Sequence, residues 1–175
     1  MRSVGLESPD RYAIGVMNAI LGGGMSSRLF TEVRERRGLC YYVHSHHDAY
    51  QDAGSVVVAA GVDTSRIDLA ITTIIEELTK LANDGPDDAE FQKAKNYLKG
   101  KFVLGVEDPR GLIMFGARRE VVEGKYWEPA EALAATPEMP GGLRLYAGEE
   151  GEPLARHLHD LTEALPNLPP IPPAD

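Results

Sequence analysis

The chain has 175 residues and a formal net charge of -9, from 18 lysines and arginines against 27 aspartates and glutamates. This acidic balance argues against a general nucleic-acid or membrane-surface binder, which would need a basic patch, and the longest apolar runs are too short to span a bilayer. One cysteine excludes an internal disulfide framework and a cysteine-only metal site, so we expect a reducing compartment and a cytoplasmic location.

The first predicted element is a helix that starts at Ser8-Pro9-Asp10, where a serine can cap, a proline suits the first helical position and an aspartate faces the positive helix end. The apolar residues that follow recur at helical spacing. Gly22-Gly23-Gly24 then ends the helix and gives a loop with almost no side chains. A second helix is predicted from a cap at Ser26 or Ser27 to Gly38.

Two strands come next. Residues Cys40–Tyr50 are rich in tyrosine, valine and histidine, and Ser55–Ala60 are apolar on both faces. The turn residues between them predict an antiparallel hairpin. Because two strands make a marginal sheet, we expect Arg2–Leu6 and Leu143–Ala147 to add one strand each. Such a small sheet has open edges, which favours edge pairing with a partner chain or a second copy of this chain.

Three further helices are predicted, over about 63–83, 87–106 and 112–122, and each is bounded by capping or breaking residues. Segregated strands and helices indicate the α+β class, with a small, mainly antiparallel sheet and helices packed on one face. We divide the chain into a domain at 1–135 and a Pro/Gly-rich linker and tail at 136–175, with a helix predicted at Pro153–Leu165 and an extended end after it.

Histidines are the first candidates for chemistry. His44 and His46 point to one face of the predicted strand, and two histidines at that spacing can share a metal. No further ligand is evident, so a polar, half-exposed strand face is the simpler interpretation. His157 and His159 would lie on different faces of a helix, which makes a shared metal less favourable still.

Arg34 and Tyr41 form a second candidate site. The turn at Gly38 can bring their tips together, where a guanidinium and a phenol could donate hydrogen bonds to a substrate carbonyl or a developing oxyanion. On spacing alone, an exposed arginine and a half-buried tyrosine explain the pair as well. The glycine loop before a helix could bind an anion through backbone N–H groups, or serve as a tight interhelical turn. Cys40 is more typical of a small core residue than of a nucleophile.

The sequence from Leu21 to Tyr41 resembles a known family. Leu-Gly-Gly-Gly-Met-Ser-Ser-Arg-Leu-Phe, followed by Arg-Gly-Leu-Cys-Tyr, is similar to the second-half domain of the insulinase-like, or pitrilysin-type, zinc peptidases, which include the mitochondrial processing peptidases. The resemblance extends to about Ala132. It implies one α+β half of a two-half clamshell, in which the first half carries zinc on a His-x-x-Glu-His motif and the second half closes the chamber.

The resemblance also implies site residues. Arg34 and Tyr41 match the Arg/Tyr pair with which the second half contacts substrate. We assign substrate binding to the residues of the loop before them: Gly22, Gly23, Gly24, Ser26 and Arg28.

This chain lacks His-x-x-Glu-His, because no two of its histidines are four residues apart. We therefore expect no cofactor and no hydrolysis from this chain alone, with zinc supplied by a partner half or subunit. The predicted function is an accessory, substrate-binding domain of a zinc metalloendopeptidase. The alternative is a non-catalytic interaction or assembly domain that keeps the fold.

Overall fold

The computed structural model of the protein describes residues 1–124 and 128–134. Its elements follow the order β1 (Arg2–Ser3), α1 (Arg11–Gly22), the π-helix η1 (Phe30–Arg36), β2 (Cys40–Ala49), β3 (Gly54–Val62), the 3-10 helix η2 (Thr64–Arg66), α2 (Ile67–Asp84), α3 (Asp88–Glu107), α4 (Pro109–Glu123) and α5 (Pro129–Ala134). The strand predicted at 143–147, the helix predicted at 153–165 and the tail lie outside the described residues.

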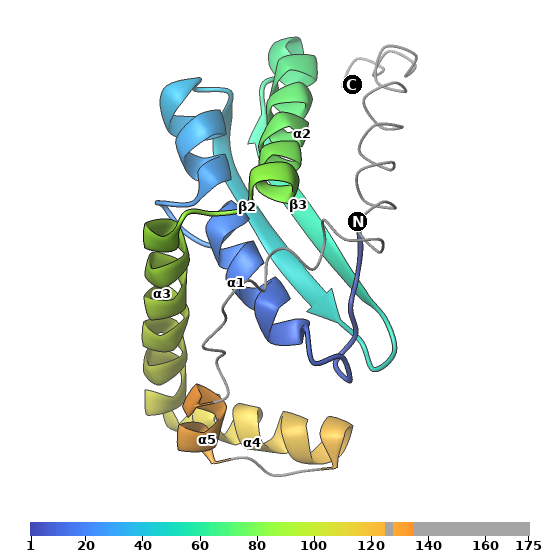
Figure 1. Ribbon diagram of the computed structural model, residues 1–175, viewed down its shortest axis with the longest axis vertical. Coiled ribbons are helices and arrows are strands. Elements are labelled where there is room, and N and C mark those ends of the chain that lie inside the picture. The colour runs from blue at the N-terminus through green and yellow to red at the C-terminus, as the bar shows by residue number, and fades with distance from the viewer. Residues whose placement is uncertain (125–127, 135–175) are drawn as a thin grey trace.

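The sheet is small and antiparallel, as predicted. β2 and β3 form a hairpin with Ser45 opposite Val58, and β1 pairs with the other edge of β3, which gives the order β1-β3-β2. β1 is shorter than the strand expected at Arg2–Leu6. Figure 1 shows α1 and α2 lying across one face of the hairpin. Side chains alternate accordingly along β2, because Val43 is buried on the helix side whereas its neighbours point the other way.

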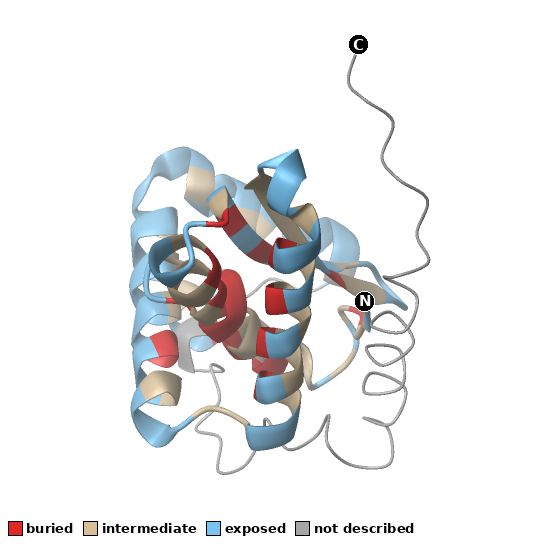
Figure 2. Cartoon of the chain, turned by 90° about the horizontal axis from the view of Figure 1, so that it is seen from above, coloured by how far each residue is buried: buried red, intermediate tan, exposed pale blue. Residues whose placement is uncertain are grey.

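The hydrophobic core lies between this face of the sheet and the helices. Its most buried side chains come from α1, from the turn before η1 and from η1 itself: Val16, Leu21, Leu29 and Val33. Parts of β2, α2 and α3 close the cluster, and Figure 2 shows the buried residues gathered between the helices. The core therefore holds together the segment that connects α1 to β2, which carries most of the predicted site residues.

Helix starts were predicted with mixed success. The side chains of Asp63, Asp87 and Asp108 accept backbone N–H groups at the starts of η2, α3 and α4. The Ser8 hydroxyl accepts the Asp10 N–H at 3.2 Å, which is the hydrogen bond expected of a capping serine, but the helix itself begins later, at Arg11. The prediction of a serine cap on the second helix is wrong, because the Ser27 hydroxyl donates to the Gly24 carbonyl at 2.6 Å.

The second helix differs in type from the prediction. Residues Phe30–Arg36 form a π-helix, in which each turn takes up more residues than an α-helical turn. The four-residue spacing of the buried Leu29 and Val33 is compatible with either form, so the sequence pattern could not distinguish them. π-turns occur frequently at functional sites, which draws attention to the side chains on this segment.

α4 is the least covered helix. It packs against α3, and its exposed apolar residues include three in succession, Leu112, Ile113 and Met114. Successive helical residues point about 100° apart, so apolar side chains face several directions. None of the helices in residues 1–124 and 128–134 has the length and low charge that crossing a membrane requires.

Candidate functional site

Arg34 lies on η1, close to the start of β2. Its guanidinium carbon is 4.6 Å from the centroid of the Phe30 ring, one turn earlier on the same element. Its charge also acts on Cys40: burial raises the pKa of that thiol, and the nearby Arg34 cation partly offsets the rise. Arg34 therefore lies on the segment that leads into β2, close enough for its charge to lower the pKa of the thiol at the first residue of that strand.

The neighbouring arginines are engaged within the protein. Arg36 pairs with Glu32 at 2.5 Å, and Arg37 donates to the Thr73 hydroxyl at 2.9 Å and lies 3.6 Å from Glu76. Arg34 has no carboxylate within salt-bridge distance among residues 1–124 and 128–134. It is thus the arginine of η1 whose positive charge is not neutralised by a described side chain.

Tyr41 is positioned by an irregularity of the strand. Cys40 lies opposite Val62 and Tyr42 opposite Gly61, so Tyr41 is an extra residue in a β-bulge. Its side chain is 84% exposed, against 50% for Tyr42. Arg34 and Tyr41 are therefore both near Cys40: the Arg34 charge acts on its thiol, and Tyr41 follows it in the chain. Within residues 1–124 and 128–134, no hydrogen bond joins Arg34 to Tyr41, so both groups can act as donors at this end of the sheet.

The glycine loop is packed against the protein rather than open. Gly22 is the last residue of α1, and a Cβ there would collide with the Ser45 backbone nitrogen. The Tyr97 hydroxyl donates to the Gly23 carbonyl at 2.6 Å, and its ring lies against Gly24. These contacts give the three glycines a structural role, as a turn between α1 and η1 that packs closely against β2 and α3.

Two loop residues that were predicted to bind substrate differ in their surroundings. Ser26 is exposed. Arg28 donates to both carboxylate oxygens of Glu90, at 2.9 and 2.8 Å, and to the Gly85 carbonyl at 2.9 Å. The hydrogen bond to Glu90 raises the pKa of Arg28 above its ordinary value, against the opposing effect of burial. Arg28 therefore ties the loop to the start of α3 and has few donors left for a ligand.

The predicted histidine pair lies on one exposed face of β2. The rings of His44 and His46 are stacked with centroids 6.0 Å apart, and His46 Nε2 is 3.3 Å from Asp48 Oδ2. In the part of the chain that the structure describes, no three histidine, cysteine or acidic residues come together in a way that would hold a metal ion. These residues therefore do not fit a zinc centre of the peptidase type. His157 and His159 lie outside the described residues.

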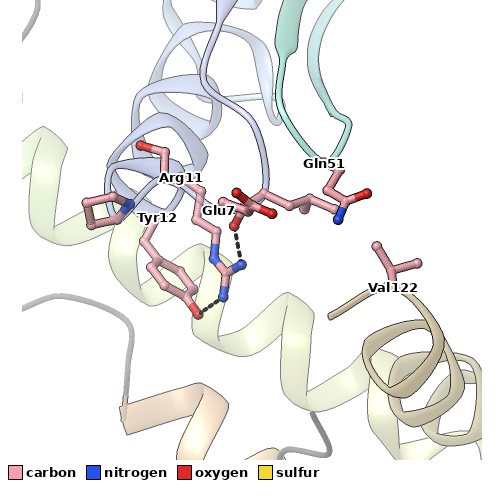
Figure 3. A pocket seen from close by; sticks show the side chains of 8 residues that line it. Glu7, Arg11, Tyr12, Gln51 and Val122 are labelled. Carbon is pink, nitrogen blue, oxygen red and sulfur yellow. Dashed lines mark hydrogen bonds between the residues drawn. The ribbon is translucent and has the colours of Figure 1, made fainter. Parts of the chain in front are cut away.

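A cavity of about 360 Å³ was not foreseen from the sequence. It lies at the opposite end of β2 from Arg34, between the segment before α1, the hairpin turn and the end of α4 (Figure 3). The Arg11 guanidinium donates there to the Leu6 carbonyl and, at 3.0 Å, to the Tyr12 hydroxyl. Val122 of α4 completes the wall. The contributing residues are far apart in the sequence and carry no motif, so only the fold could assemble them.

Comparison with known proteins gives consistent results. Residues 1–98 match the family model described as the peptidase M16 inactive domain. The chain is 40% identical over 126 residues to a protein of Mycobacterium leprae named as a zinc protease, covering 72% of this chain and 28% of that one. A zinc protease of Streptomyces coelicolor is 40% identical over 124 residues, covering 71% and 27%. The chain thus spans less than a third of the length of these relatives.

Solved structures show the same fold. The peptidase M16 inactive domain from Pseudomonas fluorescens superposes with a TM-score of 0.67 at 25% identity, covering 81% of this chain and 34% of that one. A chain of complex III2 from Candida albicans gives 0.67 at 18% identity, covering 79% and 35%. The resemblance predicted from the sequence is confirmed: the chain belongs to the peptidase M16 family and corresponds to part of its inactive domain.

Proposed function

We propose that this chain is the accessory, substrate-binding part of a zinc-dependent metalloendopeptidase, and that it completes the chamber of a partner half or subunit that carries the zinc motif. Its relatives are named as zinc proteases, and the matched region makes up 28% and 27% of their length. The described residues here do not fit a zinc site. In this proposal, the metal that polarises the scissile carbonyl and activates water belongs to the partner.

The observation that carries the proposal is that an arginine without a carboxylate partner among the described residues and an exposed tyrosine both lie near the start of β2. Arg34 keeps its charge next to Cys40 while Arg36 and Arg37 are paired with carboxylates. Tyr41 is held out of the strand by the bulge. Both groups are hydrogen-bond donors, so they suit a peptide carbonyl oxygen as negative charge develops on it.

The chemistry assigned to this pair is limited to binding and charge stabilisation. Neither side chain supplies a nucleophile or a general base in this role. Removing one donor to a developing oxyanion typically lowers kcat about 100- to 1,000-fold. The pair therefore contributes strongly to a reaction that the chain does not perform by itself.

Reconstitution tests the proposal. The first half of the Streptomyces coelicolor relative, with its zinc bound, is mixed with the full 175-residue chain, and hydrolysis of an internally quenched peptide is followed. We expect little activity from either component alone, activity that increases with the concentration of this chain until it saturates, and loss of activity when zinc is chelated. A zinc half that is fully active alone and is unaffected by this chain would contradict the proposal.

A non-catalytic assembly domain is the second candidate, and the exposure of α4 favours it. Ile113 is 67% and Val121 is 83% exposed on a helix that packs mainly against α3. Large exposed apolar patches mark interaction surfaces. Under this alternative, the same mixture forms a stable complex by size-exclusion chromatography but gains no hydrolysis, whereas the primary proposal requires both.

A further inference from the structure

Arg34 is held in place differently from the two arginines that follow it. Arg36 and Arg37 are exposed, and each lies within salt-bridge distance of a carboxylate. Arg34 is half-buried, and within residues 1–124 and 128–134 its side chain makes no ion pair and no hydrogen bond. Its guanidinium carbon instead lies over the Phe30 ring, 4.6 Å from the centroid. An aromatic ring therefore takes the place that a carboxylate takes for the neighbouring arginines.

This difference has a chemical consequence for a group that has to bind a substrate carbonyl. A carboxylate would neutralise the guanidinium and accept two of its five N–H donors. A ring face attracts the cation through its π-electrons and leaves the N–H groups that point away from the ring free to donate. The Phe30 ring can therefore orient Arg34 without removing the charge and the donors that a ligand needs.

A pair of the same kind elsewhere in the chain provides the comparison. On α4, the Arg119 guanidinium carbon lies 4.8 Å from the Phe115 ring centroid, at the same four-residue spacing. Such a pair stabilises a helix by itself, so a purely local contact would have the same effect in both places. Phe30 differs from Phe115 in that its arginine lies near Cys40, at the site of the proposed function.

We propose that Phe30 is a positioning residue, whose ring holds the Arg34 guanidinium in the orientation from which it donates to the substrate carbonyl. The inference rests on the proposed function and adds a residue to the same site. A hydrocarbon ring supplies neither a proton nor a charge, so Phe30 acts through Arg34. The ring itself stands on a fixed segment, because Leu29 and Val33 on the same turn are fully buried.

The first test measures kcat and KM in the reconstituted pair with the full 175-residue chain. Phe30→Leu keeps an apolar side chain but removes the ring, and we expect kcat to fall about tenfold with little change in KM. Phe30→Tyr keeps the ring face, so kcat should stay within about threefold of the unchanged chain. Phe115→Leu is the matched control, because it removes the ring from an arginine pair outside the site. With this chain at saturating concentration, it should leave kcat within about twofold.

Combination with Arg34→Ala separates positioning from packing. In the Arg34→Ala chain, Phe30→Leu should lower kcat by no more than about a further twofold, because no guanidinium is left for the ring to orient. If Phe30→Leu lowers kcat by the same factor with and without Arg34, the ring acts independently of that arginine and the proposal is overturned. Urea unfolding of each variant ensures that kcat is compared between folded chains.

A second readout needs neither the partner half nor activity. The Arg34 cation opposes the rise in the pKa of the Cys40 thiol, so the pH midpoint of Cys40 alkylation by iodoacetamide reports the position of the guanidinium. Phe30→Leu should move this midpoint to higher pH, in the same direction as Arg34→Ala. Phe30→Tyr and Phe115→Leu should leave it unchanged.

The two readouts distinguish failure of this inference from failure of the proposed function. In an active pair that depends on Arg34, unchanged kcat in Phe30→Leu overturns only the positioning role, whatever the alkylation midpoint does. If the pair is inactive and the midpoint moves in Phe30→Leu, the ring does hold Arg34 and only the proposed function is overturned. If the pair is inactive and the midpoint does not move, both are overturned.

Discussion

Four arginines lie on η1 or within two residues of its ends, and their side chains make different contacts. Arg28 is tied to Glu90, Arg36 to Glu32, and Arg37 to Thr73 and Glu76. Arg34 instead lies over Phe30 and beside Cys40. The sequence shows only a basic cluster, because the partners of Arg28 and Arg37 come from helices more than 30 residues away.

The closeness of Arg34 to Cys40 can be tested without any activity. Burial raises the pKa of the Cys40 thiol and the Arg34 cation lowers it, so Arg34→Ala removes the lowering effect and should raise the pKa further. The pH midpoint of alkylation by iodoacetamide measures this pKa, and it should move to higher pH. Arg36→Ala, whose guanidinium is paired with Glu32, should leave the midpoint where it is. An unchanged alkylation midpoint in Arg34→Ala would show that the Arg34 guanidinium is not close to the Cys40 thiol.

Arg28 is expected to matter for stability more than for ligand binding. Its guanidinium makes three hydrogen bonds that connect the loop to Gly85 and Glu90. Losing charged hydrogen bonds at a half-buried site should lower the free energy of unfolding of Arg28→Ala by about 1–3 kcal/mol in urea denaturation. Arg36→Ala breaks an exposed ion pair and should cost about 0.5 kcal/mol or less. Equal losses in the two variants would show that Arg28 does not have this structural role.

At the scale of elements, the packing of α1 on β2 sets the position of the whole site. The Asn18 amide donates to the Ser45 carbonyl at 3.3 Å, and Gly22 lies against the Ser45 nitrogen. α1 therefore donates a hydrogen bond to a backbone carbonyl in the middle of β2, which is an edge strand of the sheet. The sequence could predict that Gly22 ends a helix, but not that its missing side chain lets the helix approach the strand.

Two glycines on α1 give a matched test of this contact. A Cβ at Gly22 would collide with Ser45, so Gly22→Ala should destabilise the protein by about 1–3 kcal/mol. A Cβ at Gly15 meets nothing within 4 Å, so Gly15→Ala should be stabilising by about 0.5–1 kcal/mol, since alanine favours the helix. Thermal and urea unfolding measure both. Changes of the same sign in the free energy of unfolding of the two variants would contradict the close approach of α1 to β2.

Local signals predicted most of the elements, and tertiary contacts account for the differences. The hairpin, the acidic caps of η2 and α3 and the N-terminal strand follow from turn, capping and β-forming residues. The predicted start of α4 at Leu112 is too late, because Asp108-Pro109 forms the cap and first residue of that helix and not only a break after α3. The π-form of η1 has no such signal. Thr73 is fully buried within α2 although it is polar, because it accepts a hydrogen bond from Arg37. Periodicity could not foresee that partner.

The candidate site was predicted in part. Spacing placed Arg34 and Tyr41 at the same end of the sheet, and the resemblance supplied a role for them. The bulge that exposes Tyr41 depends on pairing with β3, and the structural engagement of Arg28 and Gly22 depends on α3 and β2. Side chains that face one another across the fold leave no trace in local sequence, which is why the structural contacts of Arg28 and Gly22 could not be predicted.

At the scale of the whole molecule, the described residues present two surfaces that no other described element covers. The open face of the hairpin carries the stacked rings of Tyr42, His44 and His46 beside Tyr41, and α4 carries exposed apolar side chains. The matched region makes up less than a third of its relatives, so family members have ample further chain to cover such surfaces. We therefore expect α4 to face another part of the assembly and the hairpin face to line the space that holds the substrate.

The most direct test of this account is kcat in the reconstituted peptidase with variants of this chain. With saturating peptide and the zinc-bearing half held constant, Arg34→Ala and Tyr41→Phe should each lower kcat about 100-fold or more, because each removes a donor to the developing oxyanion. Arg36→Ala should leave kcat within about twofold. Full kcat in both Arg34→Ala and Tyr41→Phe, in a pair that depends on this chain for activity, would contradict the assigned role of these two residues.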